Sequence, residues 1–484
     1  MTFSPSIPYV AAFAISSLVV MYFIFKYPSL SYYFTIASFG IILQLPLGSG
    51  FIGRNLATPS KVLGGLSILF AFIHSQAVRR RFIEPNAVFT MFTLVLLTYS
   101  ISFFVNSSSE TGWFNYLVAT SIFFTTTQYW IRDFQHLIYL KYSFIAAVGA
   151  GILQSVVFGP GIVHYLTPGT RFSGAWLNAN PAAIFCFVGS MFVFQLLMDV
   201  QRRAFPRFLL LMVLVLFIWF TFATGSRSGS LVMMTGAILG VGIYSAYYKK
   251  FGTPLLLVAA IALVVVLFTP ASFYERLILR HVIEGQMDMS EETWGDRAHL
   301  YGLALRLGME NPALGVGPGN FNTLMIRHQN RYQAAHNGFL EVFVSGGVPA
   351  LIFYCLMILL AVLLIARVAL SNMDLRIRFH AAVDCVALIL VTVSALANNG
   401  AFFRVFTLLV AISGFYQAAY LRFREGSPTD SEVATQQEIP RSAVRQSPPY
   451  TRILPRRSPV DSGGLPHHQQ RIPPESQLLS DPSE

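Results

Sequence analysis

Residues 207–224 read RFLLLMVLVLFIWFTFAT, and after the short turn 225–228 residues 229–248 read GSLVMMTGAILGVGIYSAYY. A helix needs roughly 20 mostly apolar residues to cross the hydrocarbon core of a bilayer. Both runs are of this kind. They therefore predict two membrane-spanning helices that are joined by a tight turn.

Apolar runs of the same kind recur along most of the chain. Hydrophobic residues make up 54% of the 484 residues and charged residues only 11%, whereas a soluble domain carries about 25% charged residues. The composition excludes an ordinary soluble globular protein. We predict an all-α polytopic membrane protein with about 12–13 transmembrane helices, of which the first pair is the least marked. The predicted spans are 8–26, 29–48, 60–78, 86–105, 112–130, 137–159, 180–198, 207–224, 229–248, 253–270, 338–366, 380–398 and 403–421.

The positive charges indicate how the chain is oriented. The net charge of +11 comes from residues 1–420, because basic and acidic residues cancel over 421–484. Such an excess on an apolar chain indicates orientation in a membrane rather than nucleic-acid binding. Short connections rich in Lys and Arg alternate with poor ones, and the positive-inside rule places the rich ones in the cytoplasm. The rich connections hold Arg79, Arg80 and Arg81, then Arg132 and Lys141, then Arg202, Arg203 and Arg207, then Lys249 and Lys250, then Arg367, Arg376 and Arg378; the poor ones hold Arg54, Lys61, Arg171, Arg227 and Arg404.

Two less apolar segments divide the chain into four parts. These are an N-terminal transmembrane bundle over 1–270, a large periplasmic loop over 271–336, C-terminal transmembrane helices over 337–421 and a disordered, Pro-rich cytoplasmic tail over 422–484. In the loop, residues 297–309 repeat apolar positions at helical spacing, and Asn311-Pro312 should end that helix. The tail has no periodic apolar face that could offset its chain entropy. We expect truncation after Arg424 to leave the function largely intact.

Two arginines on the predicted outer face are candidate binding residues. Arg171 lies between two spans, and Arg227 lies in the turn Gly225-Ser-Arg-Ser-Gly229. An outward Arg often only snorkels toward headgroups. At Arg227, however, the small neighbours allow close backbone approach and should leave helix-start amides open to an anion. The planar guanidinium also supplies a donor fork that matches phosphate oxygens.

His336 is the candidate proton acceptor, because it stands where the long outer loop re-enters the membrane. Its ordinary pKa of about 6.5 suits proton transfer near neutral pH. A lone His at a helix start is also commonly structural. Glu341 follows at the top of the same span, where it either orients His336 or faces water, and we favour water.

Several familiar sites have no support in the sequence. The Gly-rich run at 315–320 lacks the spacing of a dinucleotide fingerprint, and position 227 holds Arg where a hydrolase elbow needs Ser. No HExxH or CxxC motif is present, so we expect no metal and no other cofactor. Cys186, Cys355 and Cys385 lie in apolar runs, which favours small core residues over a disulfide framework.

Four motifs together resemble the O-antigen ligase/polymerase family. They occur in the order Gly225-Ser-Arg-Ser-Gly229, Asn311-Pro-Ala-Leu-Gly-Val-Gly-Pro-Gly-Asn-Phe321, His336-Asn-Gly-Phe-Leu-Glu341 and Ser345-Gly-Gly-Val-Pro349. The motif-bearing part covers residues 165–350, and the rest agrees in hydropathy. The family usually has little sequence after its last span, so the tail departs from its pattern and stays open as a binding segment for a cytoplasmic partner.

The resemblance implies transfer of a glycan from an undecaprenyl-diphosphate carrier to an acceptor hydroxyl at the periplasmic face of the bacterial inner membrane. It implies that Arg171 and Arg227 hold the diphosphate, and that His336 activates the acceptor. Arg297 falls where the family often has a basic residue, and it is carried over as a third diphosphate ligand. Arginines could stabilise the leaving group without a metal. The sequence leaves the acceptor open between a lipid core, a growing glycan and a protein hydroxyl, so a ligase, a polymerase and an oligosaccharyltransferase all stay possible.

A transporter or flippase for a lipid-linked or anionic substrate is the alternative. Transporters usually place ionisable groups near the bilayer midplane. In this chain only Asp384 and Glu341 are expected within spans, and both are expected near span ends. The polar residues outside the spans therefore favour the enzyme.

Overall fold

The computed structural model consists of helices joined by turns and loops wherever it describes the chain. It describes residues 22–40, 59–79, 81–82, 86–106, 111–158, 172, 178–199, 204–252, 254–256, 258–259, 263, 291–329, 335–397 and 403–426. The predicted tail lies outside these residues beyond Gly426, as does most of the first span and of the span 253–270. In the described ranges no strand occurs, which agrees with the predicted all-α class.

Eight helices in the described ranges are long and apolar enough to cross a membrane, and they make the chain a multi-pass membrane protein. The last of the eight combines α19 and α20. The eight are α5 (Ala87–Val105), α7 (Phe134–Phe158), α9 (Ala179–Met198), α10 (Ala204–Ala223), α11 (Arg227–Tyr248), α17 (Gly338–Ala369), α18 (Leu375–Ser394, continued by η4, Ala395–Ala397) and α19 (Phe403–Ala411) with α20 (Ser413–Arg424).

The remaining helices are shorter or less apolar. At the predicted spans 29–48, 60–78 and 112–130 lie α2 with η1, α4 and α6, whereas α15 and α16 come from the predicted outer loop. Their bounds are α2 Ser29–Ala37, η1 Ser38–Gly40, α4 Pro59–Ala77, α6 Thr111–Trp130, α15 Glu291–Glu310 and α16 Asn320–Gln329. The predicted loop helix is confirmed in α15, which stops at Asn311 as expected.

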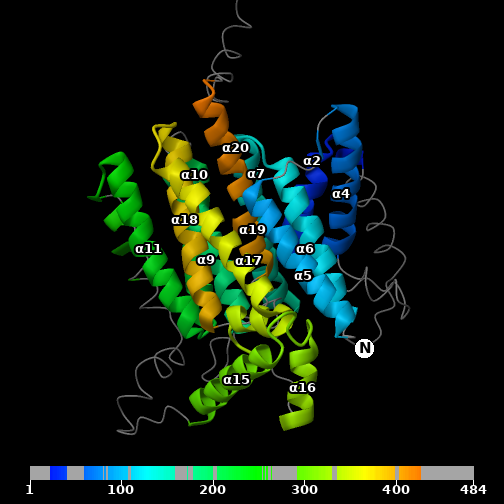
Figure 1. Ribbon diagram of the computed structural model, residues 1–484. Coiled ribbons are helices and arrows are strands. Elements are labelled where there is room, and N and C mark those ends of the chain that lie inside the picture. Colours follow the sequence, from blue (N-terminus) through cyan, green and yellow to red (C-terminus); the bar gives the residue numbers. More distant parts are fainter. Residues whose placement is uncertain are drawn as a thin grey trace, which may run out of the picture. The chain divides into compact units, whose positions relative to one another are not determined.

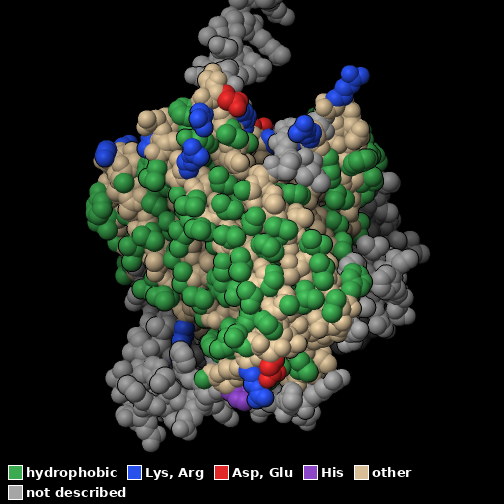
Figure 2. All heavy atoms as spheres, viewed as in Figure 1, with side chains coloured by type: hydrophobic (Ala, Val, Ile, Leu, Met, Phe, Trp, Pro, Cys, Tyr) green, Lys and Arg blue, Asp and Glu red, His purple; other side chains and the backbone are tan. Residues whose placement is uncertain are grey.

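The ends of the spans gather at two levels (Figure 1). We call the level where α20 ends the α20 end, and the level that carries α15 and α16 the α15 end. Figure 2 shows hydrophobic side chains over the middle of this face and Lys and Arg side chains gathered at the α20 end. By chain order, the described basic residues there are Arg79, Arg81, Arg132, Arg207, Lys249, Lys250, Arg367, Arg376, Arg378, Arg422 and Arg424.

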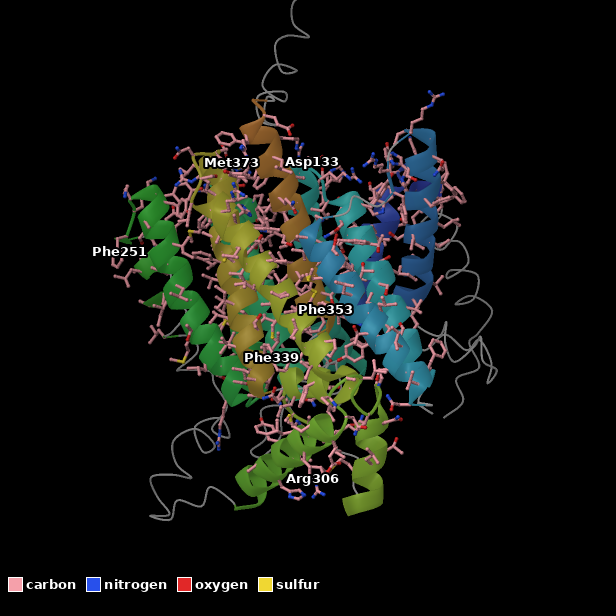
Figure 3. All side chains as sticks on the ribbon, in the orientation of Figure 1. Asp133, Phe251, Arg306, Phe339, Phe353 and Met373 are labelled. Carbon is pink, nitrogen blue, oxygen red and sulfur yellow. The ribbon has the colours of Figure 1, made fainter. Side chains whose placement is uncertain are left out.

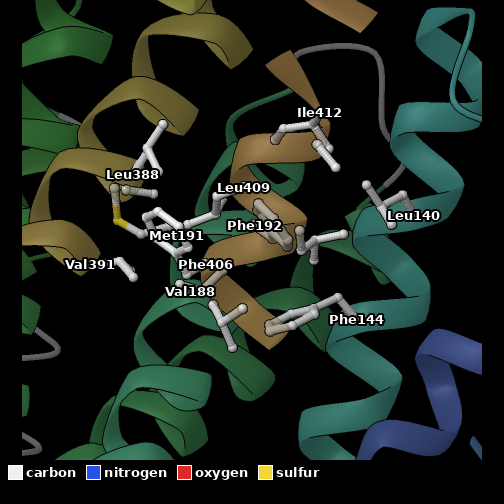
Figure 4. Close-up of a cluster of buried hydrophobic side chains, with 14 of the residues drawn as sticks. Leu140, Phe144, Val188, Met191, Phe192, Leu388, Val391, Phe406, Leu409 and Ile412 are labelled. Atoms are coloured by element: carbon white, nitrogen blue, oxygen red, sulfur yellow. The ribbon is translucent and has the colours of Figure 1, made fainter. Parts of the chain in front are cut away.

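The core is built around α9, which is buried along nearly its whole length. It packs against α7, α10, α11, α18 and α19. Figure 4 shows apolar side chains from four of these helices meeting, among them Phe144 of α7, Phe192 of α9, Leu388 of α18 and Phe406 of α19. Dispersion contacts of this kind hold membrane helices together, because lipid is as apolar as the side chains.

Glycines bring α11 close to α9. A Cβ added at Gly229 would lie 2.3 Å from Cβ of Ala183, and one at Gly236 would lie 2.5 Å from the ring of Phe187. Neither position therefore has room for a larger residue. Small residues at such contacts let membrane helices approach closely. The start of α11, which carries Arg227, is thus held directly against α9.

A buried polar cluster corrects two predictions. Lys141, placed in a cytoplasmic connection by the charge count, lies within α7, and its side chain is 0% exposed. Its Nζ lies 2.9 Å from Oδ2 of Asp384, and it also contacts His380 and Gln195. Asp384 was expected near a span end, but it lies midway along α18. The count of charged residues misplaced Lys141 and Asp384 because each charge alone would be costly within a membrane span, whereas the ion pair neutralises both.

The three cysteines are free thiols. Cys186 and Cys385 are buried, as predicted for small core residues, whereas Cys355 is exposed on α17. The prediction was therefore wrong for Cys355. An apolar run places a residue in the membrane but does not say whether it faces protein or lipid.

Candidate functional site

Arg227 is the first residue of α11, so the turn after α10 is shorter than predicted. Ser226 caps the helix, and its Oγ accepts a hydrogen bond from the backbone N–H of Gly229 at 3.2 Å. One of the helix-start amides that we expected to be open to an anion is therefore occupied by the cap. The Arg227 side chain is exposed at the α15 end. The local sequence supplies a capped helix start, which fixes the backbone position from which the Arg227 side chain extends.

The turn before Arg227 is buried and tied down. Thr224 and Ser226 are almost completely buried, and the N–H of Ser226 donates to Oγ1 of Thr224 at 3.1 Å. One turn into α11, the hydroxyl of Ser230 is buried without a hydrogen-bond partner among the described residues. Buried hydroxyls are normally paired. Ser230 therefore offers an unused donor close to Arg227 in the sequence of the helix.

The segment that contains Arg171 reaches the same turn. Phe172 is fully buried, and its backbone N–H donates to the carbonyl of Ala223 at 3.1 Å. Its ring packs against that of Phe220, with the centroids 4.6 Å apart. Arg171 itself lies outside the described residues. The structure thus brings the next residue after Arg171 to the turn before Arg227, which the sequence could not establish.

His336 stands in a left-handed backbone conformation immediately before α17, with φ of 49°. Few residues other than Gly adopt this conformation, and it commonly marks a turn or a functional site. Asn337 caps α17 by accepting hydrogen bonds from the N–H groups of Phe339 and Leu340. His336 is half-buried, next to the fully buried Ala335. The turn is thereby fixed from both sides.

Tyr301 of α15 holds the His336 turn from outside. Its hydroxyl lies 3.2 Å from the backbone carbonyl of His336 and 3.4 Å from that of Leu396, so it donates toward the turn and toward the end of α18. Figure 3 shows Phe339 at the start of α17, and Arg306 on the side of α15 that faces away from the spans. Sequence reasoning missed Tyr301, because nothing in a helical loop segment marks which residue faces a distant turn.

Glu341 does not face water, which corrects our prediction. It lies in the first turn of α17 and is only 7% exposed. A carboxylate near a helix N-terminus is favoured by the helix dipole. Position at the top of a span misled the sequence argument, because α15 and α16 cover this part of α17 through a small apolar cluster.

The Gly-rich run 311–320 docks into a kink of α17. Gly347 has φ of 73° and interrupts the helix. The N–H of Val348 donates to the carbonyl of Pro312, and the N–H of Val316 donates to that of Val344, each at 2.8 Å. A Cβ at Gly347 would lie 2.6 Å from the oxygen of Pro312. The run 311–320 and residues 344–348 of α17 are far apart in sequence, but they pack together as one unit, which we call the joint.

Ser102 of α5 and Asn106, which follows α5 directly, complete this joint. Ser102 Oγ lies within hydrogen-bond distance of the carbonyls of Leu314 and Ser345. Asn106 donates to the carbonyl of Gly315 at 3.3 Å, and it accepts from Asn320 through its own carbonyl. These residues were not predicted, because Ser102 looks like an ordinary polar residue within an apolar span. They link the α5 span to the loop that precedes His336.

Arg297 lies in α15, but its side chain is outside the described part of the chain. The helix that carries it is anchored firmly, because a Cβ at Gly308 would lie 2.3 Å from the ring of Phe343. The structure therefore places α15, the start of α11 and the His336 turn at one end of the spans. Arg227 begins α11 and His336 stands immediately before α17, and both helices pack against α18.

Residues 212–355 match the sequence profile of the family described as O-antigen ligase. The match includes Arg227, Arg297 and His336, whereas Arg171 lies before it. It also includes both halves of the joint between the Gly-rich run and α17. No curated protein matches the chain.

Proposed function

We propose that this chain moves a glycan from an undecaprenyl-diphosphate carrier to an acceptor hydroxyl. Residues 212–355 confirm the resemblance to the O-antigen ligase/polymerase family, and this family transfers glycans in membranes. The acceptor would be a glycan or a lipid. The observation that carries the proposal is that the matched region holds Arg227 at a fixed helix start and His336 at a strained turn, both at the α15 end.

Arg227 is proposed to stabilise the leaving diphosphate. As the bond between sugar and oxygen breaks, negative charge grows on the phosphate oxygens, and a guanidinium offers two parallel N–H donors to them. The buried hydroxyl of Ser230, one turn further along α11, is proposed as an additional donor. Arg171 and Arg297 are proposed as further diphosphate ligands, and this transfer would need no metal.

His336 is proposed as the general base that takes the proton of the acceptor hydroxyl. A neutral imidazole can accept this proton while the oxygen attacks the sugar carbon and the diphosphate leaves. Holding the ring in place matters because small displacements strongly reduce such rates. Asn337, Tyr301 and the joint at Gly347 would fix the backbone on both sides of His336.

The proposal requires the α15 end to face the periplasm. The surplus of basic residues at the α20 end supports this orientation through the positive-inside rule. In cells, an impermeant thiol reagent should modify a Cys placed at position 288 and should not modify one placed at 445. The reverse result would overturn the orientation and the proposed place in the bacterial inner membrane.

The test of function is transfer by purified protein with carrier-linked glycan. Arg227→Lys keeps the charge but loses the planar fork, so we expect a severe loss of transfer at unchanged folding. Arg306→Lys is the matched control, because Arg306 is exposed on the outer side of α15. If Arg227→Lys transfers at the wild-type rate, Arg227 does not bind the diphosphate through its fork.

Transport by a flippase is retained as the second candidate because of the buried pair of Lys141 and Asp384. Intramembrane charges often mark transport pathways. Asp384 of this pair also accepts hydrogen bonds from Gln195 and Tyr416. Such a network is equally typical of a structural contact between helices. Reconstituted protein that moves lipid-linked glycan across vesicles without transferring it would favour the flippase.

A further inference from the structure

A cavity of about 370 Å³ opens at the α20 end, away from the proposed transfer site. Its walls come from the start of α5, the end of α6 and one side of α20 from Gly414 onward. The volume falls within the range of about 300–1,000 Å³ for small-molecule sites. Its charged lining residues lie at the ends of α6 and α20, so this part of the cavity is at the depth where lipid headgroups meet the protein.

Two arginines converge on this cavity. Arg132 follows α6, its Nε donates to the carbonyl of Tyr129 at 2.8 Å, and its guanidinium lies 5.1 Å from the centroid of that ring. Arg422 of α20 donates through Nη2 to the backbone carbonyl of Arg132. Both side chains are half-buried. The bonds hold the two cations at one opening instead of leaving them to spread into water.

Amide groups and apolar rings complete the lining. Asn86 caps α5 and donates through Nδ2 to Oε1 of Gln128 at 3.2 Å. The Nε2 of Gln128 is buried and has no hydrogen-bond partner in the described ranges. Phe82 and Phe89 supply apolar walls. The cavity thus combines polar donors with a surface that suits hydrocarbon.

The charges of the lining select the ligand class. Its charged residues are Arg132, Arg422 and Glu425, so there is one more positive than negative charge. A phosphodiester carries a single negative charge, and guanidinium groups pair with phosphate oxygens in a bidentate manner. Asp133 (Figure 3) is not part of the lining: its Oδ2 lies 2.6 Å from Nδ1 of His136, and Arg422 contributes to lowering its pKa. Basic pockets between membrane helices bind the headgroups of anionic lipids.

We propose that this cavity binds the headgroup of an anionic membrane phospholipid in the leaflet at the α20 end. The phosphate would lie at Arg132 and Arg422, and the part of the acyl chain next to the headgroup would lie along Phe82 and Phe89. The site is distinct from the proposed transfer site and does not depend on it. Such a lipid would join the consecutive helices α5 and α6 to α20, which is distant in sequence.

The test is a lipid titration of the purified full chain in detergent, read by native mass spectrometry. Phosphatidylglycerol is the probe, and phosphatidylcholine is the zwitterionic comparison. Arg132→Gln and Arg422→Gln should each weaken phosphatidylglycerol binding by about tenfold or more, since a charged hydrogen bond is lost. Arg424→Gln is the matched control, because Arg424 is exposed at the same helix end, and it should bind within twofold of wild type.

A second variant keeps the charges and fills the cavity. Ala418 lines it, so Ala418→Leu should weaken phosphatidylglycerol binding as much as the arginine variants do. Full binding by Ala418→Leu would mean that surface charge alone attracts the lipid and would overturn the site. Equal binding of both lipids would also overturn it. If glycerol phosphate raises the melting temperature as much as the lipid does, the ligand is a soluble phosphate ester and the lipid assignment is wrong.

Discussion

Replacing Lys141 by Met should destabilise the protein strongly, because it breaks a buried ion pair. Nζ of Lys141 lies 2.9 Å from Oδ2 of Asp384, and both side chains are 0% exposed. After the change, Asp384 keeps the donors Gln195 at 2.7 Å and Tyr416 at 2.6 Å, but it loses the neighbouring cation. Removing one partner of a buried pair costs about 3–5 kcal/mol. We expect a loss of this size.

The double variant Lys141→Met/Asp384→Asn isolates the interaction of the two charges. The new amide still has an oxygen for Tyr416 or Gln195, so no charge stays buried without a partner. We expect the double variant to recover much of the stability lost in Lys141→Met, with a coupling energy of about 2–3 kcal/mol. The assay is unfolding in mixed micelles with a rising fraction of denaturing detergent.

Lys249→Met is the control for this experiment, because Lys249 is an exposed residue at the α20 end. It should change the unfolding midpoint very little. The reasoning is refuted if Lys141→Met costs less than about 1 kcal/mol, well below the range for a broken buried pair. It is also refuted if the double variant loses as much as the two single variants added together.

Three further predictions test the joint at α17 and the α20 end. Gly347→Ala should lower the free energy of unfolding by about 1–2 kcal/mol or more in the same assay, because its φ is 73° and the new Cβ would meet the oxygen of Pro312. The control Gly302→Ala, in open space on α15, should raise it by about 0.5–1 kcal/mol. Equal effects of the two variants would contradict the kink. Ser102→Ala should cost about 1–3 kcal/mol, because the carbonyls of Leu314 and Ser345 lose a donor, and an unchanged midpoint would show that the joint does not need it. Burial by itself would raise the pKa of Asp133, but hydrogen bonds from His136 outweigh burial and lower that pKa. Asp133 should therefore stabilise the fold at pH values above its unfolded-state pKa of about 3.9, and it should lose this effect as the pH falls through its lower folded-state pKa. Melting temperatures of wild type and Asp133→Asn should therefore converge in that acid range, and a constant difference would exclude the linkage.

Helix positions could be predicted from the sequence because membrane spans follow a simple rule of length and hydropathy. The spans at α5, α9 and α11, for example, begin and end within a few residues of the predicted bounds. Interior charges broke the rule. The charge count assigned Lys141 to a connection although it lies within the predicted span 137–159, because its partner Asp384 is 243 positions away in sequence and could not be recognised.

The candidate site could be predicted in part. The motifs around Arg227 and His336 stood out because small residues and a His-Asn pair at helix starts are unusual in apolar surroundings. The joint between Pro312 and Gly347 could not be predicted, because the need for a positive φ at Gly315 (65°) and at Gly347 (73°) appears only when both backbones are in place. Tyr301 and Ser102 act through backbone carbonyls, which leave no signature in the partner residue.

The transfer rate per folded molecule of His336→Ala, with carrier-lipid binding measured in parallel, tests the central claim most directly. If His336 is the general base, this variant should bind the lipid-linked donor normally and transfer roughly 10²–10⁴-fold more slowly than wild type. A well-folded His336→Ala protein that binds donor and transfers at a near wild-type rate would contradict the account.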